Sequence, residues 1–138
     1  MDMNQMIFVN LPVKDLETTK GFFAKLGFSC NPQFSDENTA CLVISDTIFA
    51  MLLTEPRFKE FTKKEVVDAS KSTEVIIALS AESREKVDEL VDTALSSGGS
   101  PANEPIDHGF MYGRSFQDPD HHIWEVMWMD PAAVQGQG

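Results

Sequence analysis

Apolar and polar residues alternate at the start of the chain, between Met6 and Val13. A period of two is typical of a β-strand, because successive side chains of a strand point to opposite faces. From Asp15 to Leu26 the apolar positions instead recur every three to four residues, which predicts an amphipathic helix with Asp15 as its N-cap. Gly27 follows directly and is a residue that commonly ends a helix. The chain therefore opens with a strand and a helix.

Turn-forming clusters divide the next residues into three predicted strands, Phe28–Phe34, Ala40–Ile44 and Thr47–Leu53. The charged segment Pro56–Ser72 lacks such a pattern, apart from a helical turn around Phe58, and is expected to connect two halves. The second half repeats the order with a strand, a helix and three strands, at Glu74–Ser80, Glu82–Ser97, Pro101–Ile106, Phe110–Gln117 and His122–Met129. The pattern predicts two β-α-β-β-β modules, at about 1–60 and 72–130, within a single domain of residues 1–138.

Length and charge narrow the class of protein. The chain has 138 residues, of which 42% are hydrophobic. This is enough for one domain with a buried core, since domains usually take about 100 to 200 residues. The 11 basic and 22 acidic residues give a net charge of −11. An acidic surface repels phosphate backbones, so nucleic acid is not an expected partner.

The sequence carries no expected membrane or export signal. No apolar run approaches the roughly 18 to 20 residues of a membrane span, and the first residues lack the basic and apolar regions of a leader peptide. We therefore expect no membrane partner and a cytoplasmic location. Cys30 and Cys41 form no metal-binding spacing, and free buried thiols are expected in preference to a disulfide.

Two segments resemble the vicinal oxygen chelate superfamily, which includes glyoxalase I, bleomycin-resistance proteins and extradiol dioxygenases. They are LPVKDLETTKGFFAKLGF (Leu11 to Phe28) and FQDPDHHIWEVMW (Phe116 to Trp128), and between them EVIIALSAES is similar to the strand that opens the family's second module. The resemblance implies an α+β fold in which two βαβββ modules form a curled sheet around a cavity. It leaves the reaction open, because members of one fold differ widely in chemistry.

The resemblance also indicates where a metal would bind. Family members that use a metal take one ligand from the first strand and one from the last strand of each module, and the matching positions here are Phe8, Ala50, Glu74 and Glu125. Phe8 and Ala50 have no ligand atoms in their side chains, whereas such metals need three or four ligands. His121 lies about 13 Å from Glu125 along an extended strand and is not expected to complete the site. No cofactor is therefore expected, although a divalent metal at Glu74 and Glu125 remains possible.

The alternation of side chains predicts which residues face the cavity. If Glu125 faces it, so do the alternate residues of the same strand and of the other cavity-lining strands, namely Ile123, Met127, Met129, Glu74, Ile76, Ala78, Phe8, Asn10, Ile48, Ala50 and Leu52. The expected cavity is mostly apolar, as small-molecule sites are. We predict Glu74 and Glu125 as catalytic residues. The predicted substrate-binding residues are Phe8, Asn10, Leu52, Tyr112, Arg114 and Met127.

Several of these residues have a structural alternative. Glu125 is an inward carboxylate in an apolar strand and either acts on a ligand or forms an ion pair with Arg114. Arg114 in turn either binds an anionic substrate or neutralises Glu125. Glu74 opens a strand and is solvated there if it has no function, while Asn10 either orients a ligand or pairs with nearby backbone. His108 precedes a glycine in a loop and is expected at the surface.

Two functions follow from this site. The first is the binding of an apolar or aromatic compound without any reaction, which the incomplete ligand set favours. The second is a metal-dependent glyoxalase-type lyase or isomerase, in which a metal or the two glutamates move a proton next to a carbonyl. Ring cleavage needs two histidines and a carboxylate on iron and is less expected. A structural or regulatory role is a third possibility. Because one module cannot enclose a cavity, a homodimer is also expected.

Overall fold

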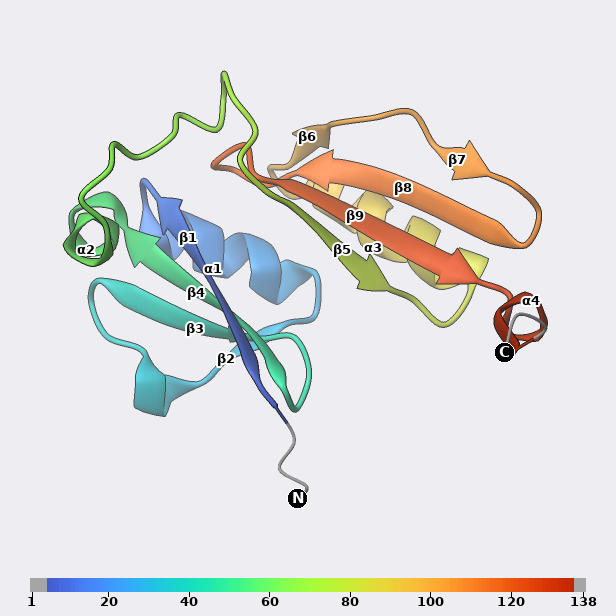
Figure 1. Cartoon of the computed structure of the whole chain (residues 1–138), viewed down its shortest axis with the longest axis horizontal. Helices are drawn as coiled ribbons and strands as arrows, with labels where there is room; N and C mark the ends of the chain where they lie inside the picture. Colours follow the sequence, from blue (N-terminus) through green and yellow to red (C-terminus); the bar gives the residue numbers. More distant parts are fainter. Residues whose placement is uncertain (1–4, 136–138) are drawn as a thin grey trace. The chain divides into compact units, whose positions relative to one another are not determined.

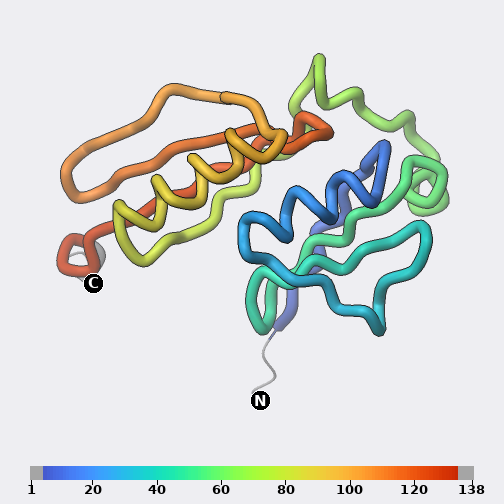
Figure 2. Tube along the Cα trace, turned by 180° about the vertical axis from the view of Figure 1, so that it is seen from behind, coloured from blue at the N-terminus to red at the C-terminus, as the bar shows by residue number. Residues whose placement is uncertain are grey.

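A computed structural model describes residues 5–135 of the chain (Figure 1). The chain divides into two compact units that meet between Val67 and Asp68, here called unit 1 and unit 2. Each unit contains one sheet with a helix packed against it, as the view from behind in Figure 2 shows. The predicted α+β class with two βαβββ modules is therefore confirmed. The assignment of both modules to a single domain stays a prediction.

The sheet of unit 1 and the helix packed against it are formed by β1 (Ile7–Val13), α1 (Leu16–Lys25), β2 (Ser29–Cys30), β3 (Thr39–Val43) and β4 (Ile48–Thr54). The sheet order is β1-β4-β3-β2, with β1 parallel to β4. Asp15 caps α1 as predicted, and its carboxylate accepts a hydrogen bond from the Glu17 amide at 3.2 Å. Gly27 ends the helix segment with a φ of +99°, a conformation that side-chain-bearing residues rarely adopt.

The core of unit 1 lies between α1 and one face of its sheet. The helix buries an apolar stripe that includes Phe22 and Phe23 and packs against β2, β3 and β4. The sheet residues on this side are almost completely buried and consist of Leu11, Val13, Ala40, Leu42, Ala50 and Leu52. Burying each large apolar side chain contributes about 1.5 to 3 kcal/mol, so this layer accounts for much of the stability of the unit.

The register of β1 and β4 corrects one sequence prediction. Phe8 pairs with Phe49 and Asn10 pairs with Met51, and residues paired in this way share a face. Ile48, Ala50 and Leu52 therefore lie on the opposite face from Phe8 and Asn10, and the prediction that they share one face is wrong. Both faces of β4 are apolar, so its sequence alone is compatible with either orientation.

Unit 2 contains β5 (Ile76–Ser80), α3 (Arg84–Ser96), β6 (Ser100–Pro101), β7 (Ile106–Asp107), β8 (Met111–Gln117), β9 (Ile123–Met129) and α4 (Pro131–Gln135). The sheet order is β5-β9-β8-β6, and β7 also pairs with β8. Ser83 caps α3, since its hydroxyl accepts a hydrogen bond from the Lys86 amide at 3.1 Å. Trp124 and Val126 face the buried stripe of α3 and are 0% and 1% exposed.

Some predicted strands are shorter in the structure. β2 ends at Cys30, because Asn31 caps a single 3-10 turn at Pro32–Phe34 by accepting a hydrogen bond from Gln33. The strand predicted at Pro101–Ile106 is split into β6 and β7, since Pro105 lacks the amide needed for continuous pairing.

The segment that connects the two units begins with two short helical turns. They are α2 (Glu55–Phe58) and η2 (Lys59–Phe61), which confirm the helical turn predicted around Phe58. No helix of the described residues is long and apolar enough to cross a membrane. Both cysteines are free, as predicted, although Cys30 is only partly buried.

The turn between β8 and β9 is held by Asp118, which is 2% exposed. Its carboxylate accepts hydrogen bonds from the backbone amides of Asp120 and His122, at 2.9 and 3.0 Å, and from the indole nitrogen of Trp124 at 3.0 Å. Burial raises the pKa of Asp118. Asp118, the first aspartate of the segment FQDPDHHIWEVMW, is therefore a structural residue that fixes the start of β9.

Candidate functional site

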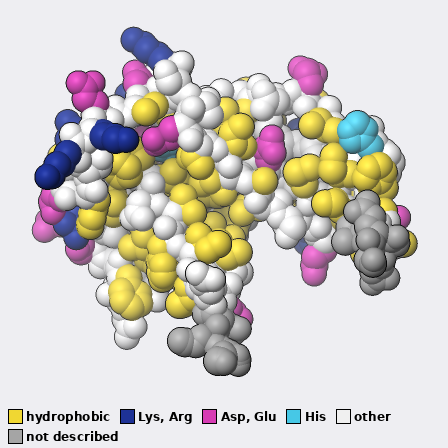
Figure 3. Space-filling model, viewed as in Figure 1, with side chains coloured by type: hydrophobic (Ala, Val, Ile, Leu, Met, Phe, Trp, Pro, Cys, Tyr) yellow, Lys and Arg dark blue, Asp and Glu magenta, His cyan; other side chains and the backbone are white. Residues whose placement is uncertain are grey.

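One face of the sheet of unit 2 is not covered by α3. It carries the β9 residues that alternate with Trp124 and Val126, namely Ile123, Glu125, Met127 and Met129. The register places Ala78 of β5 on one side of Glu125 and Ser115 of β8 on the other. This open face is toward the reader in Figure 1, and Figure 3 shows hydrophobic side chains over much of it. The predicted alternation of β9 is therefore confirmed.

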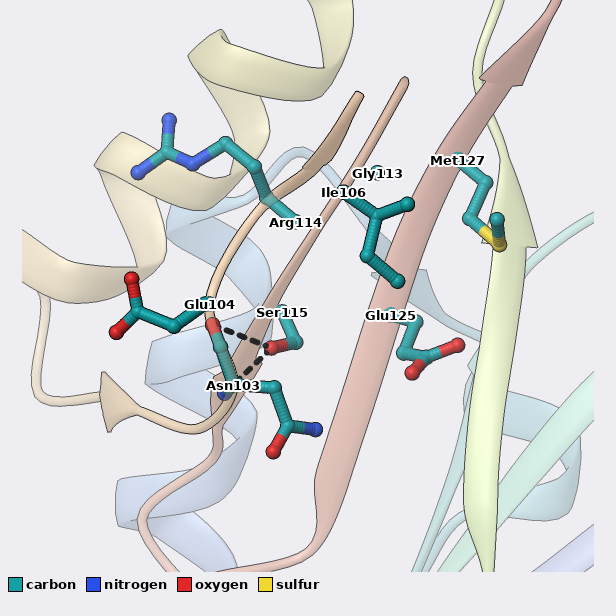
Figure 4. Close-up of a pocket in the computed structure, with 8 residues that line it drawn as sticks. All are labelled: Asn103, Glu104, Ile106, Gly113, Arg114, Ser115, Glu125 and Met127. Carbon is teal, nitrogen blue, oxygen red and sulfur yellow. Dashed lines mark hydrogen bonds between the residues drawn. The ribbon is translucent and has the colours of Figure 1, made fainter. Parts of the chain in front are cut away.

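A pocket of about 140 Å³ lies on this face (Figure 4). It is lined by Asn103, Glu104, Ile106, Gly113, Arg114, Ser115, Glu125 and Met127. Ile106 of β7 extends over the sheet and, with Met127, supplies an apolar wall, while the Glu125 side chain projects from β9 toward β5. The pocket thus combines apolar walls with few polar groups, which is the usual composition of a small-molecule site.

Glu125 is the predicted site residue that the structure places most clearly in this pocket. Its side chain is partly buried, and among residues 5–135 no hydrogen bond or ion pair engages its carboxylate. The neighbouring Ser115 hydroxyl is already used, since it accepts a hydrogen bond from the Asn103 amide at 2.8 Å. Glu125 is therefore available to a bound molecule.

Arg114 and Tyr112 lie on the opposite face of the sheet, against α3. The Arg114 guanidinium contacts Asp88 at 2.8 Å and Asp92 at 2.9 Å, and the Tyr112 hydroxyl donates to Asp88 at 2.6 Å. Of the two alternatives for Arg114, neutralisation of Glu125 is wrong, because Arg114 pairs with Val126 in the register and so faces away from Glu125. The backbone of β8 borders the pocket, but the side chains of Arg114 and Tyr112 point away from it and connect the sheet to α3.

These contacts shift the ionisation of the groups involved. Hydrogen bonds from the Tyr112 hydroxyl and from Arg114 lower the pKa of Asp88, because they stabilise its charged form. The same Asp88 contact raises the pKa of Tyr112. Arg114 is thus committed to two aspartates of α3, Asp88 and Asp92.

Glu74 lies apart from Glu125. It is exposed and precedes β5 by two residues, so it is not the first residue of that strand as predicted. It borders a second, much smaller pocket together with His121 and His122. Ile76 pairs with Ile123, so Glu74 lies about 13 Å from the level of Glu125 along the strands. The structure does not bring the two predicted catalytic glutamates together.

The remaining predicted site residues belong to unit 1. Phe8 is 51% exposed and stacks on Phe49, with ring centroids 5.0 Å apart. The Asn10 amide donates to the Phe8 carbonyl at 3.3 Å, which matches the alternative of a backbone contact. Leu52 is completely buried on the other face. His108 is exposed as expected and stacks on Phe110.

The side chains at the expected positions do not form the metal centre that the resemblance implies. Within residues 5–135, no group of three or more His, Cys, Asp or Glu side chains is placed to hold a metal ion. Phe8 and Ala50 lack ligand atoms and lie on opposite faces, and Glu74 is remote from Glu125. A single carboxylate is a poor site for divalent cations, which need several ligands.

Sequence reasoning missed most residues that line the pocket. Gly113 and Ser115 face the same side as Glu125, because they pair with Met127 and Glu125 in the antiparallel register of β8 and β9. The sequence could have indicated this pairing, because a short turn joins the two strands and the alternation of their side chains was predicted. No comparable pattern marks the loop residues Asn103 and Glu104, which have no periodicity.

Comparison with known protein families agrees with the two-module fold of this chain. The sequence model of the Glyoxalase/Bleomycin resistance protein/Dioxygenase superfamily matches residues 5–126. The chain belongs to this superfamily. The match spans both units and confirms the resemblance drawn from the two motifs. No curated protein matches this superfamily member.

Solved structures of similar proteins support the same fold. Hypothetical protein SA1046 from S. aureus is 28% identical with a TM-score of 0.77, and the match covers 92% of this chain and 95% of that one. A glyoxalase-related enzyme from Fulvimarina pelagi is 18% identical with a TM-score of 0.76, covering 91% and 88%. A bleomycin resistance determinant encoded on the transposon Tn5 is 18% identical with a TM-score of 0.64, covering 92% and 99%. The last two are similar in fold alone.

Proposed function

We propose that this superfamily member binds a small apolar or aromatic molecule on the open face of unit 2, with Glu125 holding the polar group of the ligand. The observation that carries this proposal is a carboxylate without a protein partner among residues 5–135, in a pocket with walls of Ile106 and Met127. A partly buried carboxylate is stabilised by a hydrogen-bonding partner, which a ligand can supply.

We also propose that the protein is a cytoplasmic homodimer. The homodimer is supported by exposed apolar side chains in each unit, because Phe8 of unit 1 and Ile76 and Met129 of unit 2 are each about half exposed. Large exposed apolar groups on a sheet favour association, and a two-fold dimer covers the same surface on both copies. Light scattering at micromolar concentration tests the proposal, and a monomer there contradicts it.

Binding in the pocket is tested by NMR of the full chain with labelled Ile, Val and Met methyl groups and a set of aromatic fragments. We expect fragments to shift the Ile106 and Met127 methyl signals and to leave that of Val91, a buried residue of α3, unchanged. Failure of every fragment to shift the Ile106 and Met127 signals contradicts the proposal.

A matched pair of glycine variants tests the location. A methyl group at Gly113 would lie 3.3 Å from Cγ of Met127, so Gly113→Ala crowds the pocket, whereas the same change at Gly21 meets no atom within 4 Å. One methyl group in a pocket changes affinity by about tenfold or more, so Gly113→Ala should weaken binding by that factor and Gly21→Ala should not. Equal binding by both variants would place the ligand elsewhere.

The alternative, a metal-dependent lyase or isomerase, is examined with the same sample. Native mass spectrometry after addition of zinc, nickel or manganese distinguishes the two functions. If the protein only binds a small molecule, we expect no metal that is present at one ion per chain and disappears in Glu125→Ala. Such a metal would support the lyase or isomerase function. It would also require a further metal ligand, which the described residues of either unit do not supply.

A further inference from the structure

The pocket on the open face presents the Glu125 carboxylate, and no cationic side chain points into it. Two of its lining residues are Glu104 and Glu125, and its one basic lining residue is Arg114. Figure 4 shows the Arg114 side chain directed away from the pocket toward α3, where it contacts Asp88 and Asp92. The guanidinium therefore does not neutralise the charge of the pocket.

No other basic residue of this part of the sequence takes over that role. After Lys86, Arg114 is the only lysine or arginine in the chain. Arg84, at the start of α3, forms two hydrogen bonds with the Asp107 carboxylate, at 2.7 and 3.0 Å, and donates to the Gly109 carbonyl at 3.0 Å. On the face shown in Figure 3, lysine and arginine side chains instead gather over α2 and the segment that follows it.

The polar groups beside Glu125 cannot serve as its counter-charge. The Ser115 hydroxyl is engaged with the backbone of Asn103, and Glu125 has Ala78 on its other side. Glu104 adds a second negative charge at the edge of the pocket, although its carboxylate points away from Glu125 in Figure 4. The net charge of −11 adds to the negative potential.

We infer that the ligand of this pocket is an organic cation, in which an ammonium or amidinium group contacts the Glu125 carboxylate and an apolar part lies against Ile106 and Met127. This inference rests on the proposed function and specifies its ligand class. An apolar wall and a single inward carboxylate match an amine with a hydrocarbon body better than a hydrated metal ion, which needs several oxygen ligands. An anionic ligand would meet the Glu125 carboxylate without any opposing cation in the pocket.

The test compares three compounds of similar size, benzylamine, benzyl alcohol and phenylacetate, which are cationic, neutral and anionic at pH 7. Each is titrated into the full chain, and dissociation constants are taken from the Ile106 and Met127 methyl signals. A charge-assisted hydrogen bond should make benzylamine bind about tenfold more tightly than benzyl alcohol, with phenylacetate weakest. Added salt should reduce the difference, because the pocket is partly open to solvent.

Two glutamate variants show whether the preference belongs to Glu125. Glu125→Gln keeps the shape of the side chain and removes its charge, so the preference for benzylamine should disappear while benzyl alcohol still binds, which also shows that the pocket is folded. Glu37→Gln removes the same charge from an exposed turn of unit 1 and should leave the preference unchanged.

The outcomes separate this inference from the function on which it rests. Equal binding of benzylamine and benzyl alcohol, tighter binding of phenylacetate, or a preference that persists in Glu125→Gln overturns the inference and leaves small-molecule binding intact. If none of the three compounds shifts the Ile106 and Met127 signals, and the aromatic fragment set also fails, the proposed function is wrong and the inference falls with it.

Discussion

Substitution of Asp118 is expected to destabilise unit 2 strongly, although Asp118 is not a lining residue of the pocket on the open face. Its carboxylate joins the turn before β9 to the completely buried Trp124. Asp118→Ala removes the acceptor of three hydrogen bonds. Asp118→Asn keeps one oxygen for the two backbone amides but places an amino group against the indole nitrogen of Trp124, so one of the three contacts is lost.

The structure gives the expected size of both effects. A buried donor that loses its acceptor costs about 1 to 3 kcal/mol, and the amide of His122 and the indole of Trp124 are the two most buried donors. Burial destabilises the charged form of the Asp118 carboxylate, as its raised pKa indicates. Removal of this carboxylate therefore offsets part of the cost. We therefore expect a loss of about 3 kcal/mol for Asp118→Ala and about 1.5 kcal/mol for Asp118→Asn.

Urea unfolding followed by tryptophan fluorescence measures these changes in unit 2 alone, because Trp124 and Trp128 are the only tryptophans and both lie there. Asp46→Asn, in an exposed turn of unit 1, is the matched control and should change the free energy of unfolding by less than about 0.5 kcal/mol. The reasoning is refuted if Asp118→Ala is as mild as the control, or if Asp118→Asn costs more than Asp118→Ala.

Two further predictions concern the contacts of α3. Asp88→Asn should destabilise the protein by about 1 kcal/mol at pH 7, because the charged carboxylate accepts from Tyr112 and Arg114. Hydrogen bonds from Tyr112 and Arg114 lower the folded-state pKa of Asp88, so this stabilisation is complete above the usual carboxyl pKa of about 4 and is lost as the pH falls through the lowered pKa. Urea unfolding should therefore show the variant approaching the wild type as the pH falls below about 4, and a constant difference would contradict this. Arg84→Lys should release β7, since lysine cannot form the paired hydrogen bonds to Asp107, and the amide protons of β7 should exchange about tenfold faster in hydrogen-exchange NMR. Unchanged exchange would mean that strand pairing alone holds β7.

The sequence by itself determined the elements and the family. The ends of α1 were predicted to within one residue from Asp15, Gly27 and the period of the apolar residues. This was possible because capping and amphipathicity depend on residues close together in the sequence. The segments around α1 and around Glu125 together indicated the superfamily, and the second of them predicted the alternation of β9. There Trp124 and Val126 are bulky and apolar while Glu125 is charged, so one orientation buries the apolar residues and the other would bury the charge.

The tertiary structure decided which residues share a face and which line the pocket. In β4 both sets of alternating side chains are apolar, so the register with β1 was needed to place Leu52 opposite Phe8. Arg114 is one strand from Glu125, and only the pairing of Ser115 with Glu125 shows that the two charges point to opposite faces. Ile106 reaches the pocket from β7 through long-range pairing. Periodicity describes neighbours along the chain, whereas these contacts depend on strand register, and a shift of one residue reverses every side chain.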